Sequence, residues 1–423
     1  MLIVFLSFLT LMFLGMPVGF AILISGITFF LQHADTLFTT IVQLPVSQVQ
    51  NVNLIAVPLF IFAGNLMNCS GITERLIKLA LALAGHYRGG LAQASVLLST
   101  LMGGVSGSAN ADAAMEARVL GPDMLKHGYP KGYTACLIAF TSVITAIIPP
   151  GVSMVMFGSV GNISIGQLFT AGITVGLLLT VLYMILVAIT ARKYKPVYDR
   201  RRTLKEVLPI MKESIWAAVF PVILIFGLRF GLFTPSEVGA FACVYAFLIG
   251  VFVYREITPE KLFKALQTSV MDIGAIMFMI SMSAVFGYGI PIEKLPQKLI
   301  VLIEGFTASP YMVMAFIIAF LAIVGMFMEG SIIILLSTPI LLPLILSYGI
   351  DPIAFGLILC TVVTMSNMTP PMGLAMFTVC GILNVPLEDY VKSCLPWVSV
   401  ILIAAALITI FPQIATCLVR LLY

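Results

Sequence analysis

The sequence predicts an all-α polytopic membrane protein with an inverted-topology repeat, two re-entrant hairpins and two helices broken at Pro-Pro pairs. Hydrophobic residues make up 61% of the 423 residues and charged residues 9%, a composition outside the range of soluble domains. Residues 132 to 191 contain no Asp, Glu, Lys, Arg or His. Two Pro-Pro pairs, Pro149-Pro150 and Pro370-Pro371, interrupt apolar segments. A break leaves backbone carbonyl groups of the helix without hydrogen-bond partners, and the hydrocarbon core of a bilayer contains no water to replace those partners. Such breaks therefore occur where the chain lines a cavity.

The N-terminal part, residues 1–89, is predicted to contribute scaffold helices. Residues 2–32 are apolar but are interrupted by Gly15, Pro17 and Gly19. They therefore form either one kinked span or two short ones, and the side of the N-terminus depends on which. This segment has no charged n-region, so we expect a membrane segment and no cleaved signal peptide.

The next segment is rich in glycine and is predicted to be the first re-entrant hairpin. Its centre, residues 102–112, holds three glycines, two serines, Asn110 and Asp112, which disfavour a regular helix. The arms on either side are too short to span a bilayer separately. The alternative is one spanning helix whose Gly103 and Gly107 pack against a neighbour. We interpret residues 90–190, which also include the first broken helix, as the first transport repeat.

The loop at 191–212 is predicted to be cytoplasmic. It holds eight of the 22 Lys and Arg residues, and short loops rich in these residues face the cytoplasm. The basic loop 255–264, placed two crossings later, agrees with that assignment. Spans at about 213–231, 237–254 and 268–290 are predicted to belong to a second scaffold segment, residues 213–310.

Residues 311–423 are predicted to repeat the organisation of residues 90–190. A shift of 221 positions places Gly104 on Gly325 and the first Pro-Pro pair on the second. Five predicted crossings separate the two glycine-centred segments, so the two halves face opposite ways, as in secondary transporters. In the second hairpin, Glu329 lies between uncharged flanks of 24 and 21 residues. A lone intramembrane carboxylate indicates a functional site; the alternative is a carboxylate near an aqueous cavity or paired with a distant cation.

The polar residues near the hairpin tips and helix breaks are mostly hydroxyls and amides. Together with freed backbone carbonyls, these hard oxygen ligands suit a hard cation, while helix N-termini suit an anion such as a carboxylate. The combination predicts cation-coupled uptake of an organic anion. The alternative for any single Ser or Thr is a hydrogen bond to its own helix backbone. The residues that we expect to bind substrate are Asp112, Thr145, Glu329, Ser366 and Asn367.

Other functional classes are disfavoured. The sequence has no Walker-type phosphate loop and no HExxH motif, and its three histidines fall in predicted loops, so we expect no enzymatic activity. The seven cysteines are scattered singly without metal-ligand spacing. A channel remains the second class, although no charge ring or repeated carbonyl filter appears.

The sequence resembles the large membrane (M) subunit of the tripartite ATP-independent periplasmic (TRAP) transporters. The residues that carry the resemblance extend over the whole chain and include Gly104-Val105-Ser106-Gly107-Ser108, Ile148-Pro149-Pro150, Gly325-Met326-Phe327-Met328-Glu329 and Thr369-Pro370-Pro371-Met372-Gly373. The resemblance implies a multi-pass protein of the bacterial inner membrane and an elevator-type, Na+-coupled importer of organic acids such as C4-dicarboxylates or sialic acid. It also implies two partners: a small four-helix membrane (Q) subunit and a periplasmic substrate-binding (P) protein. A standalone sodium:organic-anion symporter without a binding protein is the alternative.

The resemblance also implies two sodium sites at the hairpin tips and helix breaks. One would use Ser106, Ser108, Asn110, Pro149 and Gly151, and the other Gly325, Thr369 and Met372. Two departures from the family pattern affect the acidic residues. Many members have Asp where Glu329 stands, and an added methylene moves the carboxylate, so a direct ligand role for Glu329 stays open. Many members of the family also have apolar residues at the positions around Asp112.

Overall fold

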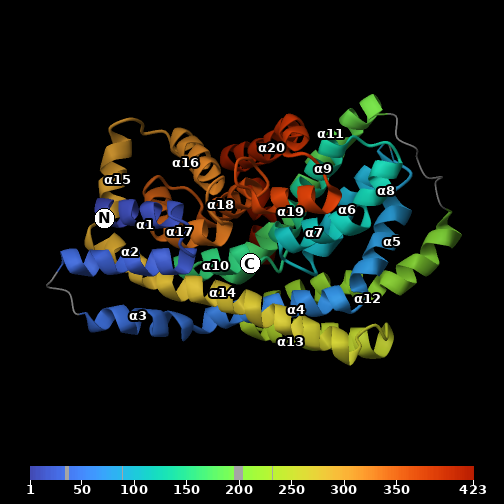
Figure 1. Ribbon diagram of the computed structural model, residues 1–423, viewed down its shortest axis with the longest axis horizontal. Coiled ribbons are helices and arrows are strands. Elements are labelled where there is room, and N and C mark those ends of the chain that lie inside the picture. The colour runs from blue at the N-terminus through green and yellow to red at the C-terminus, as the bar shows by residue number, and fades with distance from the viewer. Residues whose placement is uncertain (34–37, 88, 195–202, 231) are drawn as a thin grey trace.

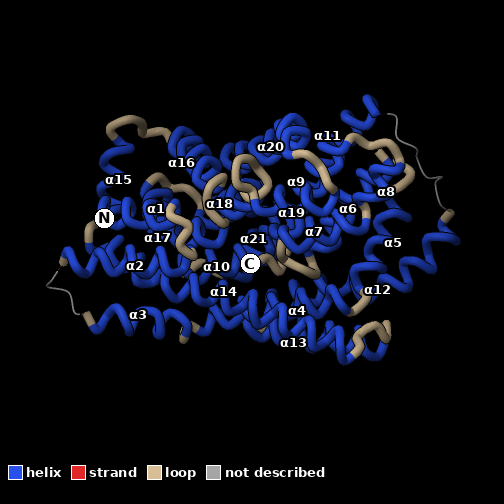
Figure 2. Tube along the Cα trace, viewed as in Figure 1, coloured by secondary structure: helices blue, strands red, loops and turns tan. Residues whose placement is uncertain are grey.

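The computed structural model of this chain describes residues 1–33, 38–87, 89–194, 203–230 and 232–423. All regular elements in these residues are helices (Figures 1 and 2). Five helices in the described part are long and apolar enough to cross a bilayer, and two bent helix pairs also have that length and composition. The chain is therefore a multi-pass helical protein, as its composition predicts.

The N-terminal 32 residues form two short helices. α1 (Leu2–Phe13) and α2 (Val18–Gln32) pack against each other after a turn at Gly15, whose φ of 81° favours glycine. The N-terminal ammonium group of Met1 lies 2.6 Å from Glu293 Oε1, and His33 Nε2 lies 3.9 Å from the same atom. Both ends of this helix pair are therefore on the same side of the molecule. Residues 2–32 form two short helices and not one kinked span.

Three helices and a 3₁₀ turn follow. They are α3 (Thr39–Val49), the 3₁₀ turn η1 (Val52–Ile55), α4 (Ala56–Cys69) and α5 (Ile72–Ala84). α4 and α5 meet at an angle of 69°. The bend occurs at Gly71, which has a φ of 82°, a conformation that residues with a Cβ rarely adopt.

The first glycine-rich segment folds as a helical hairpin. Its arms are α6 (Gly90–Gly103) and α7 (Ala109–Val119), followed by the short α8 (Gly121–Lys126). The hydroxyl of Tyr129, which follows α8, donates a 2.5 Å hydrogen bond to the carbonyl of Gly89, which precedes α6. The segment therefore begins and ends on the same side of the molecule.

The predicted break at the first Pro-Pro pair is present. α9 (Lys131–Ile147) ends there, and α10 (Val152–Gly161) continues at an angle of 46°. Pro supplies no backbone N–H and collides with the preceding turn, so a regular helix cannot continue through the pair. α11 (Ile165–Tyr194) follows as one helix of 30 residues.

The middle of the chain adds further long helices. They are α12 (Leu204–Arg229), α13 (Pro235–Leu248), the π-helical turn η2 (Ile249–Val253), α14 (Pro259–Ile292) and α15 (Leu295–Glu304). The predicted loop 191–212 is shorter in the structure, because α11 extends to Tyr194 and α12 starts at Leu204; residues 195–202 lie outside the described residues. The start of α12 is stabilised by Glu206, whose carboxylate accepts a 2.9 Å hydrogen bond from the Thr203 backbone N–H.

The C-terminal part has the same order of elements as residues 90–194. A second hairpin is followed by a second broken helix and a long helix; the elements are α16 (Pro310–Gly325), α17 (Gly330–Ser347), α18 (Pro352–Ser366), α19 (Leu374–Leu383), α20 (Leu387–Ile410) and the short α21 (Gln413–Leu422). The Tyr348 hydroxyl donates a 3.2 Å hydrogen bond to the Thr307 carbonyl at the base of this hairpin. Asn162 and Asn384, which end α10 and α19, share the left-handed conformation.

The helices form two packed groups. α14 lies against α2, α3 and α4, and α13 also packs on α4 (Figure 1). In the other group, α9 packs on α6, α7 and α20, and α18 packs on α16, α17 and α20. The hairpins and broken helices therefore surround a common core, while α2–α4, α13 and α14 form a wall beside it.

Candidate functional site

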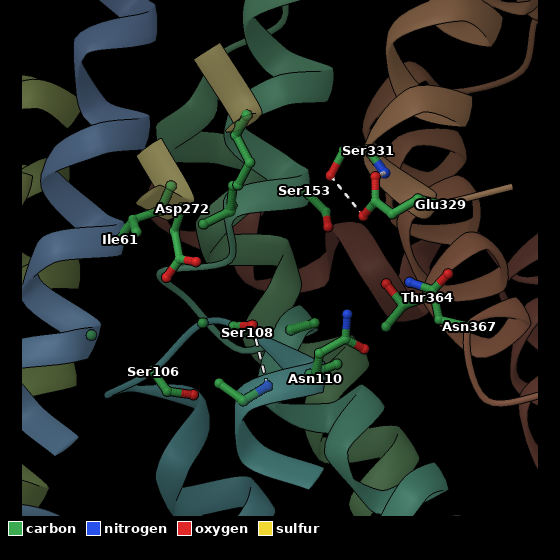
Figure 3. A pocket seen from close by; sticks show the side chains of 18 of the residues that line it. Ile61, Ser106, Ser108, Asn110, Ser153, Asp272, Glu329, Ser331, Thr364 and Asn367 are labelled. Carbon is green, nitrogen blue, oxygen red and sulfur yellow. Dashed lines mark hydrogen bonds between the residues drawn. The ribbon is translucent and has the colours of Figure 1, made fainter. Parts of the chain in front are cut away.

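A polar cavity of about 450 Å³ lies between the two hairpin tips and the wall formed by α4 and α14. Figure 3 shows side chains from all three parts directed toward the same space. The polar lining residues come from α4, α7, α10, α14, α17 and α18 and from the two hairpin turns; they are Asn65, Asn68, Ser106, Ser108, Asn110, Ser153, Asp272, Glu329, Ser331, Thr364 and Asn367.

The first hairpin tip presents oxygen atoms that have no partner. Ser106 Oγ and Asn110 Oδ1 are buried and make no hydrogen bond within the described part of the chain. Ser108 Oγ accepts a long 3.5 Å hydrogen bond from the Ala111 N–H and so caps α7. A buried polar atom without a partner is costly. These oxygens therefore favour an occupant that accepts electron pairs, such as a cation.

The approach of this tip to the first helix break is very close. Gly107 has a φ of 58°, and a Cβ at this position would overlap the Pro150 carbonyl oxygen. Only glycine satisfies both conditions, since it has no Cβ and tolerates positive φ. Backbone atoms of the break thus lie immediately beside the tip.

The second hairpin tip places Glu329 at the N-terminus of α17. Its carboxylate accepts hydrogen bonds from the Ser331 N–H at 2.9 Å and from the Ser331 hydroxyl at 3.0 Å. The exposed N–H groups and the dipole of the helix N-terminus stabilise a negative charge there. Asn367, at the end of α18, lies on the same side of the cavity (Figure 3).

The third part of the cavity comes from helices that the sequence analysis assigned to the scaffold. Asn65 on α4 donates hydrogen bonds to Ser269 Oγ at 3.0 Å and to Asp272 Oδ2 at 3.4 Å. Asp272 lies across the cavity from Glu329 (Figure 3). The sequence held a signal for Asp272, because it is the one charged residue between Lys264 and Glu293. This is the same criterion that selected Glu329.

Of the five residues expected to bind substrate, Glu329 and Asn367 line the cavity, whereas the other three are buried away from it. The Thr145 hydroxyl lies 2.6 Å from Asp112 Oδ2 and 2.9 Å from the Ser99 carbonyl oxygen. The Ser366 hydroxyl donates a 2.9 Å hydrogen bond to the Val362 carbonyl, four residues back on α18. A substrate contact by these three residues stays a prediction.

Among the residues expected to form sodium sites, Ser106, Ser108 and Asn110 line the cavity; Pro149, Gly151, Gly325, Thr369 and Met372 do not. Pro149 and Gly151 lie at the first break, beside the first tip. Gly325 packs so tightly on α18 that a Cβ would overlap the Ser366 side chain. Thr369 donates a 2.8 Å hydrogen bond to the Ser366 carbonyl, and the Met372 side chain is exposed.

The structure also reveals a buried acid that the sequence analysis did not single out. Glu116 on α7 is fully buried and accepts hydrogen bonds from Ser95 at 2.5 Å and Ser99 at 2.7 Å. These three residues link the two arms of the first hairpin behind its tip. In the sequence, Glu116 is not a lone carboxylate among apolar residues, because Asp112 and Arg118 lie close to it.

Comparisons with known proteins agree with this arrangement. A family profile described as "Tripartite ATP-independent periplasmic transporter, DctM component" matches residues 5–414. The chain is 34% identical to the 2,3-diketo-L-gulonate TRAP transporter large permease protein YiaN of Escherichia coli, covering 92% of this chain and 91% of the relative. It is 33% identical to the C4-dicarboxylate TRAP transporter large permease protein DctM of Pseudomonas aeruginosa, covering 87% and 86%.

Two further comparisons extend the result. The sialic acid TRAP transporter large permease protein SiaM of Vibrio cholerae is 32% identical over 96% of this chain and 95% of its own length. The crystal structure of the Alcanivorax borkumensis YdaH transporter shares the fold, with a TM-score of 0.64 and 13% identity over 86% of each chain. From the family profile and these relatives, the chain belongs to the large permease component of the TRAP transporters.

Proposed function

We propose that this protein imports an organic acid across the bacterial inner membrane by coupling its movement to Na+. In this proposal it acts with a small membrane subunit and receives its substrate from a periplasmic binding protein. The family membership supports these two partners, and the names of the relatives support an organic acid as cargo, since they include a C4-dicarboxylate, sialic acid and a sugar acid.

The observation that carries the sodium proposal is the pair of unpartnered oxygens at the first hairpin tip. Ser106 Oγ lies in the turn, whose backbone is held against the first helix break, and Asn110 Oδ1 lies in the first turn of α7. Hydroxyl, amide and carbonyl oxygens are the ligands of a hard cation, and no thiolate or imidazole is among the lining residues of the cavity. A bound Na+ would satisfy both oxygens and offer positive charge to a carboxylate substrate.

The division of the cavity walls supports an elevator mechanism. One side consists of the hairpin tips and the ends of the broken helices, and the other side consists of α4 and α14. If the first group moves as a unit against the second, the cavity and its contents change sides without opening a continuous pore. The buried contacts of α9 and α18 with both long helices and hairpin arms would keep the moving group rigid.

The proposal is tested in proteoliposomes that contain this chain and its small partner subunit. We expect uptake of the acid only when the binding protein is added and external Na+ is present. Replacing Na+ with choline should abolish uptake, whereas a protonophore should leave the initial rate unchanged. Uptake that persists in choline and collapses with the protonophore would overturn sodium coupling. Equal rates with and without the binding protein would favour the standalone symporter.

A further inference from the structure

The charge of the cavity restricts the substrate. Its lining includes two carboxylates, Asp272 and Glu329, and none of its lining residues is Lys, Arg or His. A substrate with two carboxylates would bring two more negative charges into a site with no fixed positive charge. Na+ at the first hairpin tip would neutralise the charge of one substrate carboxylate. The second substrate carboxylate would still face Asp272 on the opposite wall of the cavity.

Asp272 and Glu329 differ in how many hydrogen bonds their carboxylates accept from the protein. Glu329 accepts two short hydrogen bonds from Ser331 at the start of α17. Asp272 accepts one long hydrogen bond of 3.4 Å from Asn65, and its Oδ1 atom makes none within the described residues. Asp272 is therefore the carboxylate with free acceptor capacity, and it is directed into the cavity (Figure 3).

The neighbours of Asp272 also leave its carboxylate available to a ligand. Asn65 holds the carboxylate from one side and also donates to Ser269, one helical turn earlier on α14. Ile61 and Ile276 lie beside these groups in the cavity wall. Asp272 is exposed, with Asn65 on one side and an oxygen facing the cavity, so its carboxylate is accessible to hydrogen-bond donors of a ligand.

We propose that the substrate is a carboxylic acid whose other end carries hydrogen-bond donors, either hydroxyl or ammonium groups, and that Asp272 binds those donors. This inference rests on the proposed function and specifies its substrate class. The substrate carboxylate lies toward the hairpin tips, where the unpartnered oxygens and Na+ are expected. A bare dicarboxylate is excluded by repulsion from Asp272, so this residue determines specificity.

The test uses matched acids and the purified membrane subunits in Na+ buffer. The first pair, 4-aminobutyrate and succinate, differs at one end. The second pair, gluconate and adipate, has carbon chains of the same length, but gluconate carries hydroxyl groups along its chain and adipate carries a second carboxylate. Binding is measured as the increase in thermal unfolding temperature at millimolar ligand, and transport as competition with uptake of the acid that the cognate binding protein delivers. We expect 4-aminobutyrate or gluconate to bind and compete, and succinate and adipate to do neither. Binding of 4-aminobutyrate would indicate that Asp272 accepts from an ammonium group, and binding of gluconate would indicate that it accepts from hydroxyl groups.

Asp272→Asn tests the residue itself. Losing the charged acceptor should raise the half-maximal concentration of the donor-bearing acid about tenfold or more, the effect of one charge-assisted hydrogen bond, and should improve competition by the matching dicarboxylate. Asp272→Glu should retain the wild-type preference even if folding of the Asn variant is impaired. Asp123→Asn, an exposed acid on α8 outside the cavity, is the control and should leave the preference unchanged.

The outcomes separate this inference from the proposed function. If a dicarboxylate binds and competes at least as well as its partner, or if Asp272→Asn leaves the preference unchanged, the substrate-class inference is wrong while organic-acid import stands. If none of the four acids binds or competes, the substrate-class inference is also wrong. If, in addition, no organic acid is taken up with the binding protein present, the proposed function fails as well.

Discussion

The Tyr129 hydroxyl donates a hydrogen bond to the Gly89 carbonyl and thereby ties the end of the first hairpin segment to its beginning. Tyr348 and Thr307 form the corresponding contact at the base of the second hairpin, with a longer bond of 3.2 Å. In both cases a tyrosine that follows the second arm closes the segment. The hairpins are therefore held at their bases, while their tips line the cavity.

Tyr129→Phe should destabilise the protein by about 0.5–1.5 kcal/mol, because it removes one hydrogen bond to the Gly89 carbonyl while changing the shape of the side chain little. That carbonyl keeps a 2.7 Å hydrogen bond from the Ala92 N–H. Thermal unfolding in detergent measures the effect. Tyr348→Phe is the matched variant and should cost less, since its bond is longer. An equal or larger loss for Tyr348→Phe would show that the base of the first hairpin is held mainly by other contacts.

Gly325→Ala should disturb the second hairpin, because the added methyl group would overlap the Ser366 side chain on α18. Overpacking of this kind costs about 1–3 kcal/mol. The double variant Gly325→Ala with Ser366→Gly removes the obstructing side chain and should recover part of the lost unfolding temperature. Failure of the second change to restore any stability would mean that the glycine serves the backbone conformation and not the close approach.

Asn110→Ala should weaken sodium coupling more than it weakens folding. The Asn110 side-chain oxygen has no hydrogen bond to lose, so removing it should raise the Na+ concentration for half-maximal uptake about tenfold, equivalent to about 1.4 kcal/mol. Thr258→Ala, which removes a helix cap on α14 away from the cavity, is the control. Wild-type sodium dependence in Asn110→Ala would remove this residue from the proposed ion site.

Glu293→Gln should reduce stability at neutral pH by about 1 kcal/mol or less, as expected for an ion pair whose carboxylate is partly exposed to solvent. The hydrogen bond from the Met1 ammonium group, together with Lys298, holds the pKa of Glu293 below its usual range. A lowered pKa means that the contribution is present above the pKa of the unfolded state and is lost as the pH falls through the folded value. Wild type and variant should therefore converge at low pH in thermal unfolding measurements, and a gap that grows on acidification would contradict this assignment.

The two sides of the membrane can be identified by labelling single cysteines in a cysteine-free background. Gln32→Cys and Lys298→Cys should react from the same side, because His33 and Lys298 both lie near Glu293. That side should be the periplasm, since the predicted span 268–290 separates Glu293 from the cytoplasmic loop 255–264. Lys126→Cys on α8 should react from the cytoplasmic side, because Tyr129, just after α8, is bonded to Gly89, which lies against Ala191 near the end of α11. An impermeant thiol reagent applied to intact cells and then to opened vesicles distinguishes them. If the cysteines at positions 32 and 126 were labelled from the same side, the proposed placement of the N-terminal helix pair would be wrong.

Several features of the fold follow directly from the sequence, because they depend on local chemistry. Long apolar segments must be helical in a membrane, since every backbone polar group needs a partner within the segment. The break after Ile147 follows from Pro149-Pro150, and the turn between α6 and α7 follows from glycines that helices tolerate poorly. The lone carboxylate Glu329 was identified by the cost of placing a charge among apolar residues.

Other features required the tertiary structure, because they depend on how helices rotate and pack. The sequence placed Asp112 and Glu329 in corresponding hairpins, yet Asp112 is buried beside Thr145 while Glu329 faces the cavity. Asp272, from a helix assigned to the scaffold, completes the same cavity. Local sequence determines that a segment is a helix and where it breaks. The direction of each side chain, toward the cavity or into the core, is decided by contacts with helices distant in the sequence.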